Sequence, residues 1–413
     1  MLLDNGVWKV DVFFTLAIAT GLLILGTWIV SRVRFLSKYS IPEAVVGGLL
    51  AATLLTTARG VADLKIEFND VLQRPLNVMF FTTVGLMADV RSIAKGGRML
   101  LLYFISIVGL LVMQNVLGGA LAALFGIHPV NGLIAGSITL AGGHGTGAAW
   151  GGEFESGAAW GVDKGYKMPG SVALAIACAT YGLVAGGLLG GPFARWIMSR
   201  HNLSGSGVRA EMSLPSEPRL KPEIPVKVLT ETLLLTFVAL AVGLLLYGKY
   251  GQATKIPPFL WSLGLGAILR NLLSVTRLYA VDDRAAELIG SLSLSLFLSM
   301  AIMSLKLWEL MALAIPVIVI LTVQTVTMLA YTALVTFRMM GKDYDAVLLS
   351  TGQIGFGLGS TATAIAGMQS VAVRCGYSPQ AFLLVPVMGA FLIDVANMAV
   401  IRGFMLLPGF GPR

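Results

Sequence analysis

Two glycine-rich segments carry the groups of this chain that are best suited to holding a small anionic solute. The first reads GGHGTG over residues 142–147, and the second reads GFGLGST over residues 355–361. Glycine lets a backbone approach a ligand closely, and helices that begin in such segments aim backbone N–H groups at an anion. The alternative is that the glycines serve only close helix packing. We predict substrate contacts from Gly143, His144, Gly145, Thr146 and Gly147 in the first segment, and from Gly359, Ser360, Thr361 and Thr363 around the second.

His144 is the only one of the three histidines that lies inside a hydrophobic segment. A histidine at this depth could donate to a substrate carboxylate or carry a proton. It could equally brace the segment with one hydrogen bond. The residue type alone does not separate these roles.

A charged side chain interrupts the last apolar stretch, at Asp394. A charge at the centre of a membrane helix costs at least about 2.5–3.5 kcal/mol, so something must offset it. Asn397 lies three residues further on the same helix face and adds a second oxygen. Sodium favours hard oxygen ligands. We predict a sodium site from Asp394, Asn397, Thr361 and Ser137, with a structural hydrogen bond from Asp394 as the alternative.

Two glutamines occupy comparable places in the two halves of the chain. Gln114 lies in the sequence VMQNV and Gln324 in VQTV. Amide side chains inside a membrane protein hydrogen-bond across helices or to freed backbone groups. We expect Gln114 and Gln324 to support the glycine-rich segments rather than to bind substrate.

The composition places most of the chain in lipid. Of its 413 residues, 56% are hydrophobic and 12% are charged, whereas soluble domains carry about 25% charged residues. The net charge of +8 comes from basic residues that punctuate apolar segments, which indicates a membrane partner rather than nucleic acid. No phosphate-binding loop, HExxH helix or nucleophile elbow is present. We therefore expect a protein that is not an enzyme and whose energy source, if any, is an ion gradient.

Segments long and apolar enough to cross a bilayer occur ten times. A span needs about 20 apolar residues. The two glycine-rich segments, at about 130–150 and 346–370, are too broken for ordinary spans, and we predict re-entrant hairpins there. The fold class expected is an all-α integral membrane protein whose ten transmembrane helices run near 11–30, 41–59, 75–90, 98–125, 171–197, 228–248, 257–275, 286–306, 310–339 and 379–407.

The chain repeats itself weakly at an offset of 215 residues. Pro42 then corresponds to Pro257, and Gly142 corresponds to Gly357. We predict an N-terminal repeat over 1–197, a linker over 198–227 and a C-terminal repeat over 228–413. Five spans per half is an odd number, so the two repeats insert in opposite orientations, as in many secondary transporters.

Lysine and arginine set the orientation of the spans. An N-terminus outside the cell places 18 of the 29 basic residues on the cytoplasmic side, in agreement with the positive-inside rule. Both termini are then periplasmic and the linker is cytoplasmic. The first hairpin enters from outside and the second from the cytoplasm, so their tips could meet and form the two walls of one site.

The sequence GLIAGSITLA at 132–141, followed by GGHGTGAAW, closely resembles the bacterial sodium/glutamate symporter family. The stretches SIPE at 40–43, LLVMQN at 110–115 and SLSLFL at 293–298 agree with it, and the resemblance covers essentially the whole chain. It implies sodium-coupled uptake of L-glutamate across a bacterial inner membrane, a homodimer, inverted repeats and an elevator-like motion. Sodium is the only cofactor that it implies.

The chain departs from the family pattern in the second hairpin, where Gln353 replaces a His and Ala362 replaces a Pro. One alternative is therefore a sodium- or proton-coupled carrier of another carboxylate, such as a hydroxy-dicarboxylate. A channel or a receptor that does not transport is the alternative from a different class. A channel would favour a continuous polar stripe along its spans, and few polar residues lie outside the predicted hairpins.

Overall fold

The computed structural model describes residues 2–4, 7–38, 41–62, 65–89, 97–156, 166–205, 224–254, 256–305 and 313–411. Most of the predicted linker, over 206–223, lies outside the described residues. The elements are β1 (Leu2–Asp4), β2 (Val7–Val10), α1 (Val12–Arg32), α2 (Arg34–Lys38), α3 (Glu43–Ala62), β3 (Lys65–Phe68), α4 (Gln73–Leu86), α6 (Gly97–Leu124), α7 (Pro129–Leu133), η1 (Ile134–Ile138), α8 (Gly143–Ser156), α9 (Ser171–His201), α10 (Val226–Thr254), α11 (Pro258–Thr276), α12 (Asp283–Met303), α13 (Ala314–Tyr331), η5 (Thr332–Thr336), α14 (Phe337–Met339), α15 (Tyr344–Leu358), α16 (Thr361–Cys375), α17 (Pro379–Val387), η6 (Met388–Leu392) and α18 (Ile393–Met405), where η marks a π-helical segment.

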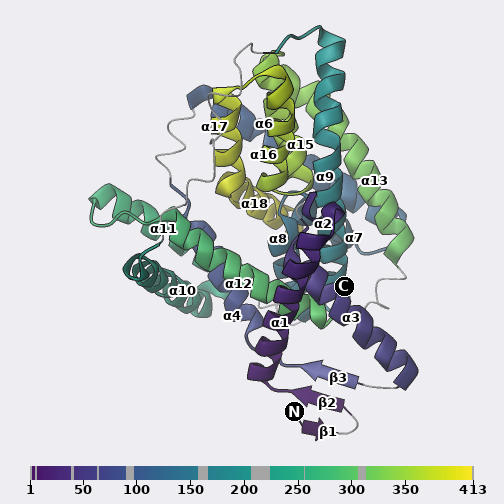
Figure 1. The fold of residues 1–413 in the computed structure, drawn as a ribbon, viewed down its shortest axis with the longest axis vertical. Helices are drawn as coiled ribbons and strands as arrows, with labels where there is room; N and C mark the ends of the chain where they lie inside the picture. Colours follow the sequence, from purple (N-terminus) through teal and green to yellow (C-terminus); the bar gives the residue numbers. More distant parts are fainter. Residues whose placement is uncertain are drawn as a thin grey trace.

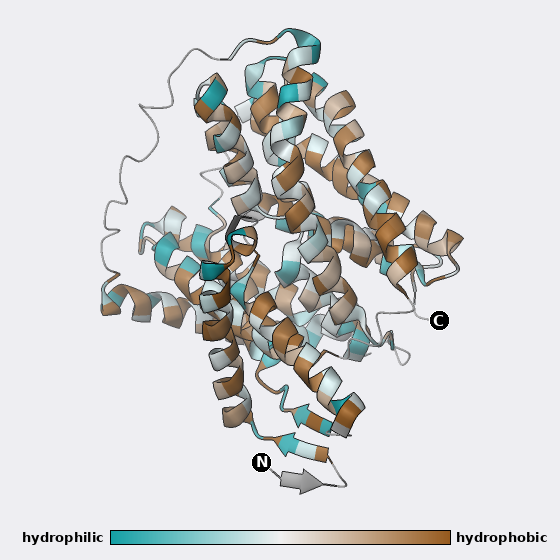
Figure 2. Cartoon of the chain, turned by 45° about the vertical axis from the view of Figure 1, so that its right-hand side comes forward, coloured by the Kyte–Doolittle hydropathy of each residue, from teal (hydrophilic) through white to brown (hydrophobic). Residues whose placement is uncertain are grey.

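Eight of the described helices are long and apolar enough to cross a membrane: α1, α3, α6, α9, α10, α11, α12 and α13 with its continuation to Met339. The chain is therefore a multi-pass membrane protein. Their outward faces are apolar (Figure 2), with Phe13 79% exposed and Leu245 73% exposed. Such exposure would be costly in water and is expected in contact with lipid.

The other two expected spans, near 75–90 and 379–407, take a different form. The first corresponds to α4, which has 14 residues. The second corresponds to α17 and α18, which the π-helical η6 separates, with Pro386 inside α17. A π-helical turn and a proline both disrupt the regular i to i−4 hydrogen bonds.

A small sheet accompanies the helices at the N-terminal end of the chain. Strand β2 pairs antiparallel with β1 and parallel with β3, with Trp8 opposite Ile66. Hydropathy did not predict it, because each of these strands has only three or four residues.

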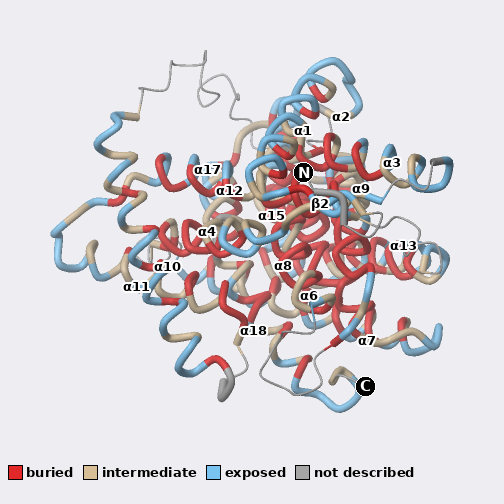
Figure 3. The backbone as a smooth tube through the Cα atoms, turned by 90° about the horizontal axis from the view of Figure 1, so that it is seen from below, coloured by how far each residue is buried: buried red, intermediate tan, exposed pale blue. Residues whose placement is uncertain are grey.

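The helices form two groups (Figure 1). In the first, α4 packs on α11 and α12, α10 packs on α11, and α1 and α3 pack on each other and on α12. In the second, α9 packs on α8, α15 and α16, and α6 packs on α7 and α18. Buried residues are concentrated along α6, α8 and α15 (Figure 3). The groups meet chiefly through contacts of α12 with α8 and α9 and of α4 with η6.

The glycines of α9 set how closely it approaches α15. A Cβ at Gly182 would lie 2.0 Å from the carbonyl oxygen of Leu358, and one at Gly186 would lie 3.1 Å from that of Gly355. The repeat of small residues along α9 therefore serves close packing within one chain, as such repeats commonly do.

Candidate functional site

Two pairs of short helices present their turns to the centre of the protein. In the second pair, α15 and α16 pack together and are joined by Gly359 and Ser360. The Tyr344 hydroxyl donates to the carbonyl of Gly376 over 2.6 Å, which ties the two outer ends of this pair together.

The first pair consists of α7 with η1 and then α8. Its two outer ends lie beside the C-terminal tail. The His128 ring contacts the Gly411 carbonyl at 3.2 Å, and the Tyr166 hydroxyl, near the end of α8, donates to the carbonyl of Phe410. Burial raises the pKa of Tyr166 to about 12, so this hydroxyl keeps its proton and remains a donor.

The tips of the two pairs touch. Gly143 has a φ of +65°, and a Cβ built on it would lie 3.5 Å from the carbonyl oxygen of Gly359. A left-handed residue at this position strongly favours glycine. The GGHGTG segment therefore supplies both the turn and the first residues of α8.

The second tip is closed by a capping box. The Ser360 hydroxyl accepts from the backbone N–H of Thr363 over 3.2 Å, and the Thr363 hydroxyl accepts from the N–H of Ser360 over 3.0 Å. A capping box satisfies the free N–H groups at a helix start. Helices α8 and α16 thus both begin at the meeting point, where their partial positive charge favours an anion.

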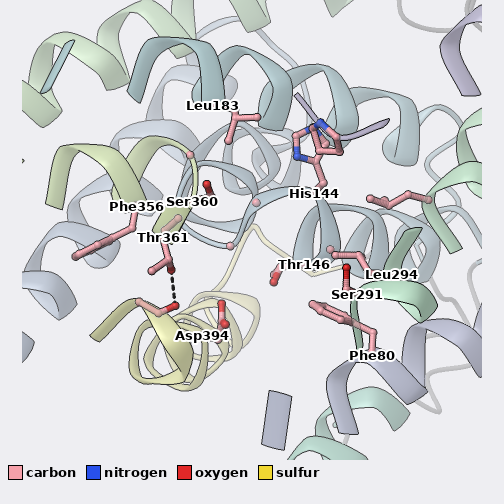
Figure 4. Close-up of a pocket in the computed structure, with 18 of the residues that line it drawn as sticks. Phe80, His144, Thr146, Leu183, Ser291, Leu294, Phe356, Ser360, Thr361 and Asp394 are labelled. Carbon is pink, nitrogen blue, oxygen red and sulfur yellow. Dashed lines mark hydrogen bonds between the residues drawn. The ribbon is translucent and has the colours of Figure 1, made fainter. Parts of the chain in front are cut away.

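A cavity of about 400 Å³ lies where the two tips meet. One wall is the tips and α18, and the other belongs to α3, α4 and α12, so the cavity lies between the two groups of helices (Figure 4). This volume is within the range for small-molecule sites, about 300–1,000 Å³. The ionisable residues that line it are Glu43, His144 and Asp394.

Most of the predicted substrate residues line this cavity: Gly143, His144, Gly145, Thr146, Gly359, Ser360 and Thr361. Gly147 and Thr363 do not. A Cβ on Gly147 would lie 3.3 Å from the Cβ of Ala175, so this residue faces α9. The Thr363 hydroxyl donates within the second tip, to the carbonyls of Gly355 and Ser360. The interactions of Gly147 and Thr363 are therefore ones that hold the tips in place.

The opposite wall contains residues that sequence reasoning missed. Phe80 on α4 and Ser291 and Ser295 on α12 line the cavity beside the tips. A Cβ on Gly145 would lie 2.8 Å from the Phe80 ring, so the two walls are in close contact here. The SLSLFL stretch at 293–298, which contains Ser295, agrees with the family resemblance and could have pointed to this part of the cavity. Because Ser and Leu alternate in this stretch, the sequence does not show which face of the helix lines the cavity.

His144 is braced by Thr180 of α9. Its Nε2 lies 3.1 Å from the Thr180 hydroxyl, and that hydroxyl donates its proton to the carbonyl of Ile176 over 2.8 Å. Since the only proton of Thr180 is used in this way, the hydrogen-bond network assigns the ring proton to Nε2. His144 is 7% exposed and lines the cavity at the same time.

The four residues predicted for sodium divide into two pairs. Thr361 and Asp394 line the cavity, and the Thr361 hydroxyl donates to the Gly389 carbonyl over 2.7 Å, as Figure 4 shows beside Asp394. Ser137 and Asn397 lie deeper, both fully buried, with the Asn397 amide donating to the carbonyl of Ser137 over 2.8 Å. No hydrogen bond or ion pair is found for the Asp394 side chain among the described residues.

The two glutamines connect the helix pairs across the two halves of the chain. The Gln114 amide donates to the carbonyl of Gly357 in α15 over 3.0 Å. The Gln324 amide donates to the backbone carbonyl of Gln114 over 2.6 Å. Residue Gly136, where η1 leaves helical geometry with φ −111° and ψ −132°, lies against the backbone carbonyl of Gln114 and the side-chain amide of Gln324.

A multi-pass membrane protein with a cavity between the N-termini of broken helices has the features of a secondary transporter. Sequence comparison identifies the family. A model of the sodium/glutamate symporter family matches residues 8–377. The chain is 45% identical over 407 residues to the sodium/glutamate symporter of Escherichia coli K12, covering 98% of this chain and 99% of that protein. It is 42% identical over 393 residues to the Haemophilus influenzae sodium/glutamate symporter, covering 94% and 95%. The chain belongs to the sodium/glutamate symporter family.

Proposed function

We propose that this protein carries L-glutamate into the cell together with sodium. The observation that carries the proposal is the meeting of two helix N-termini, those of α8 and α16, at one cavity that also contains Asp394. Family membership supports the same function. The substrate is moved and not chemically changed, so no enzymatic role is proposed.

The carboxylates of glutamate match the helix N-termini at the cavity in number and in sign of charge. It has two carboxylates, and two helix N-termini face the cavity. Backbone N–H groups there and the hydroxyls of Thr146 and Ser360 would donate hydrogen bonds to the carboxylates. No lysine or arginine is among the residues that line the cavity. Helix ends and hydroxyls must therefore provide the donors, because the one ring proton of His144 is directed at Thr180.

Sodium would bind at the carboxylate of Asp394 and the hydroxyl of Thr361. The Thr361 proton points to Gly389, so the lone pairs of its oxygen remain available to a cation. A bound cation would also offset the cost of placing the Asp394 charge inside the membrane. Substrate and sodium would thus share one cavity, which is a physical basis for coupling.

The two helix pairs are proposed to be re-entrant hairpins, over about 130–150 and 346–370, that enter from opposite faces. Helix α9 supports this arrangement. The Val172 amide, at its start, donates to Glu155 in the first pair over 3.0 Å. Near its far end, Gly205 lies against the backbone of Cys375 in the second pair. With α4 and the broken α17–α18 as the remaining spans, the chain would comprise ten spans in inverted repeats, 1–197 and 228–413, joined by a linker at 198–227.

We place the protein in the bacterial inner membrane with both termini periplasmic and the linker cytoplasmic. The basic residues Arg195, Arg200 and Arg374 then lie at the cytoplasmic ends of α9 and α16. Alternating access would be elevator-like, with the helices that hold the tips moving against α3, α4 and α12. Their contact includes a cluster of apolar side chains such as Ala44, Ala148 and Leu298. Homodimer formation is proposed from the family resemblance.

Uptake of radiolabelled glutamate into proteoliposomes tests the function. We expect a sodium gradient alone to drive accumulation, a proton gradient alone to drive none, and excess citrate not to compete. Lithium, imposed in the same way, measures the selectivity of the cation site. Accumulation driven by protons alone would contradict sodium coupling and favour the other carboxylate carrier. The replacements at Gln353 and Ala362 make competition by related dicarboxylates an informative part of this assay.

Variants of His144 separate bracing from proton carriage. In His144→Gln, the side-chain amide can replace the Nε2–H that is directed at Thr180, but it cannot carry a proton. We expect sodium-driven uptake several-fold above that of His144→Ala, because a buried acceptor left without its donor costs about 1–3 kcal/mol. Equal loss of uptake in the two variants, measured in the same proteoliposomes, would instead contradict bracing of Thr180 as the role of His144.

A further inference from the structure

Three residues with side-chain amides, Gln114, Gln324 and Asn397, lie around the break in the first helix pair, deeper in the protein than the cavity. A Cβ on Gly136 would lie 3.0 Å from the backbone carbonyl oxygen of Gln114 and 3.4 Å from the Gln324 side-chain nitrogen. The next residue, Ser137, accepts from the Asn397 amide through its carbonyl over 2.8 Å. Elements α6, α13, α18 and η1 therefore contribute to one small region.

The nitrogen of each of these amides is used by a backbone carbonyl. Gln114 donates to Gly357, Gln324 donates to Gln114, and Asn397 donates to Ser137. These bonds fix the amide orientations, so the oxygens are the atoms left over. The oxygens of all three side chains are buried and have no hydrogen-bond partner among the described residues.

The hydroxyl of Ser137 is a fourth such oxygen. It too is buried without a partner in the part of the chain that the structure describes. We call Ser137 Oγ, Asn397 Oδ1, Gln114 Oε1 and Gln324 Oε1 the deep oxygen cluster. All four side chains are 0% exposed.

The chemistry of the deep oxygen cluster favours a cation. The amide oxygens can only accept, and the Ser137 hydroxyl can accept as well. The donors nearby are the unpartnered Asn115 Nδ2, the Ser137 hydroxyl proton and the second proton of each amide nitrogen. The Asn115 oxygen accepts from the Ser137 N–H over 3.2 Å, on the same break. A water molecule can donate to at most two of the four oxygens. A hard monovalent cation is satisfied by neutral oxygens, as at unwound helices in other transporters.

We propose that the deep oxygen cluster is a second cation site, distinct from the one at Asp394 and Thr361, and that it binds sodium. This inference rests on the proposed function, and it deepens it by naming where another coupling ion binds. A cation here would hold η1 against α18 and, through Gln114 and its bond to Gly357, would fix the second helix pair as well. The positions of both tips would then depend on its presence.

A sodium titration of thermal unfolding tests the site. The purified full-length protein is titrated in detergent, with choline chloride keeping the ionic strength constant. Ser137→Ala removes one oxygen and leaves the backbone bonds of Ser137 in place. We expect it to raise the sodium concentration for half-maximal stabilisation at least about tenfold. The matched control is Ser350→Ala, because Ser350 Oγ is also buried and unpartnered in the described structure but lies in α15. It should behave as the unchanged protein does.

Two further variants keep the test decisive. If Ser137→Ala does not fold, Ser137→Cys is closer in size and replaces the oxygen by a sulfur, which is a poor sodium ligand, so the same shift is expected. In Asp394→Asn, a sodium response from the deep oxygen cluster should persist, and Asp394→Asn combined with Ser137→Ala should abolish it.

An unchanged sodium midpoint in Ser137→Ala and in Ser137→Cys would overturn the second site. Sodium-driven glutamate uptake by the unchanged protein would then still stand, since it is measured independently in proteoliposomes. Loss of that uptake in the unchanged protein would instead contradict the proposed function itself.

Discussion

Asp394→Asn is expected to raise the sodium concentration for half-maximal glutamate uptake by roughly 10- to 100-fold. The carboxylate lines the cavity next to Thr361. Among the described residues, the Asp394 carboxylate forms no ion pair that could substitute for a bound sodium. Interactions with a charged group contribute about 1.5–3 kcal/mol, and each 1.4 kcal/mol is a factor of ten in affinity. Asparagine keeps the size of the side chain and one of its oxygens. The loss of sodium affinity therefore measures the contribution of the charge. Sodium-dependent uptake in proteoliposomes measures it.

Two further variants serve as controls for the Asp394→Asn prediction. Asp394→Glu keeps the charge and should retain part of the sodium affinity. Asp345→Asn makes the same chemical change in the first turn of α15, at the outer end of the second helix pair, and should leave the sodium dependence as it is. If Asp394→Asn transports with an unaltered sodium dependence, Asp394 is not a sodium ligand, and a structural hydrogen bond becomes its role.

Gly182→Ala is expected to destabilise the protein by about 1–3 kcal/mol, the usual range for overpacking, and to impair uptake. A Cβ at this position would lie 2.0 Å from the Leu358 carbonyl oxygen and 2.9 Å from a methyl carbon of Leu140. Leu358 directly precedes the second tip, and Leu140 belongs to the turn of the first. One added methyl group would therefore push on both tips. Thermal unfolding in detergent and uptake per folded protein measure the effect.

Gly191→Ala is the matched control on the same helix. Its Cβ would have only the Ser370 hydroxyl within 4 Å, at 3.6 Å, which is an ordinary contact. Both variants gain the helix propensity of alanine over glycine, about 0.8–1 kcal/mol, so a difference between them reports packing. Equal unfolding temperatures for the two variants would mean that α15 can move away from α9 without cost.

The local part of the site could be predicted from sequence. The segment GGHGTG predicts a backbone turn, and Gly143 does adopt positive φ at the start of α8. Gly359 to Thr361 line the same cavity as Gly143 to Thr146. The turn and its positive φ follow from residue type, since glycine content and hydroxyl positions are properties of short stretches of chain, whereas the sharing of one cavity is a result of packing.

The residues of the opposite wall of the cavity could not be predicted in this way. Phe80, Ser291 and Ser295 reach the cavity because α4 and α12 pack together and turn one face towards the tips. Which face a membrane helix turns inwards depends on its neighbours, because the lipid-facing side is as apolar as the packed side. The sequence of α12 alone is compatible with other faces.

The sequence by itself determined that this is a membrane protein with two related glycine-rich segments and one isolated carboxylate, because these depend on composition and local pattern. The tertiary structure decided which of those groups share a cavity. It brings Asp394 and Thr361 to the cavity and places Asn397, one helical turn from Asp394, at the break beside Ser137. The physical reason is that distances between residues far apart in the chain are set by helix packing, and a spacing of three along one helix does not reveal which neighbour each side chain will meet.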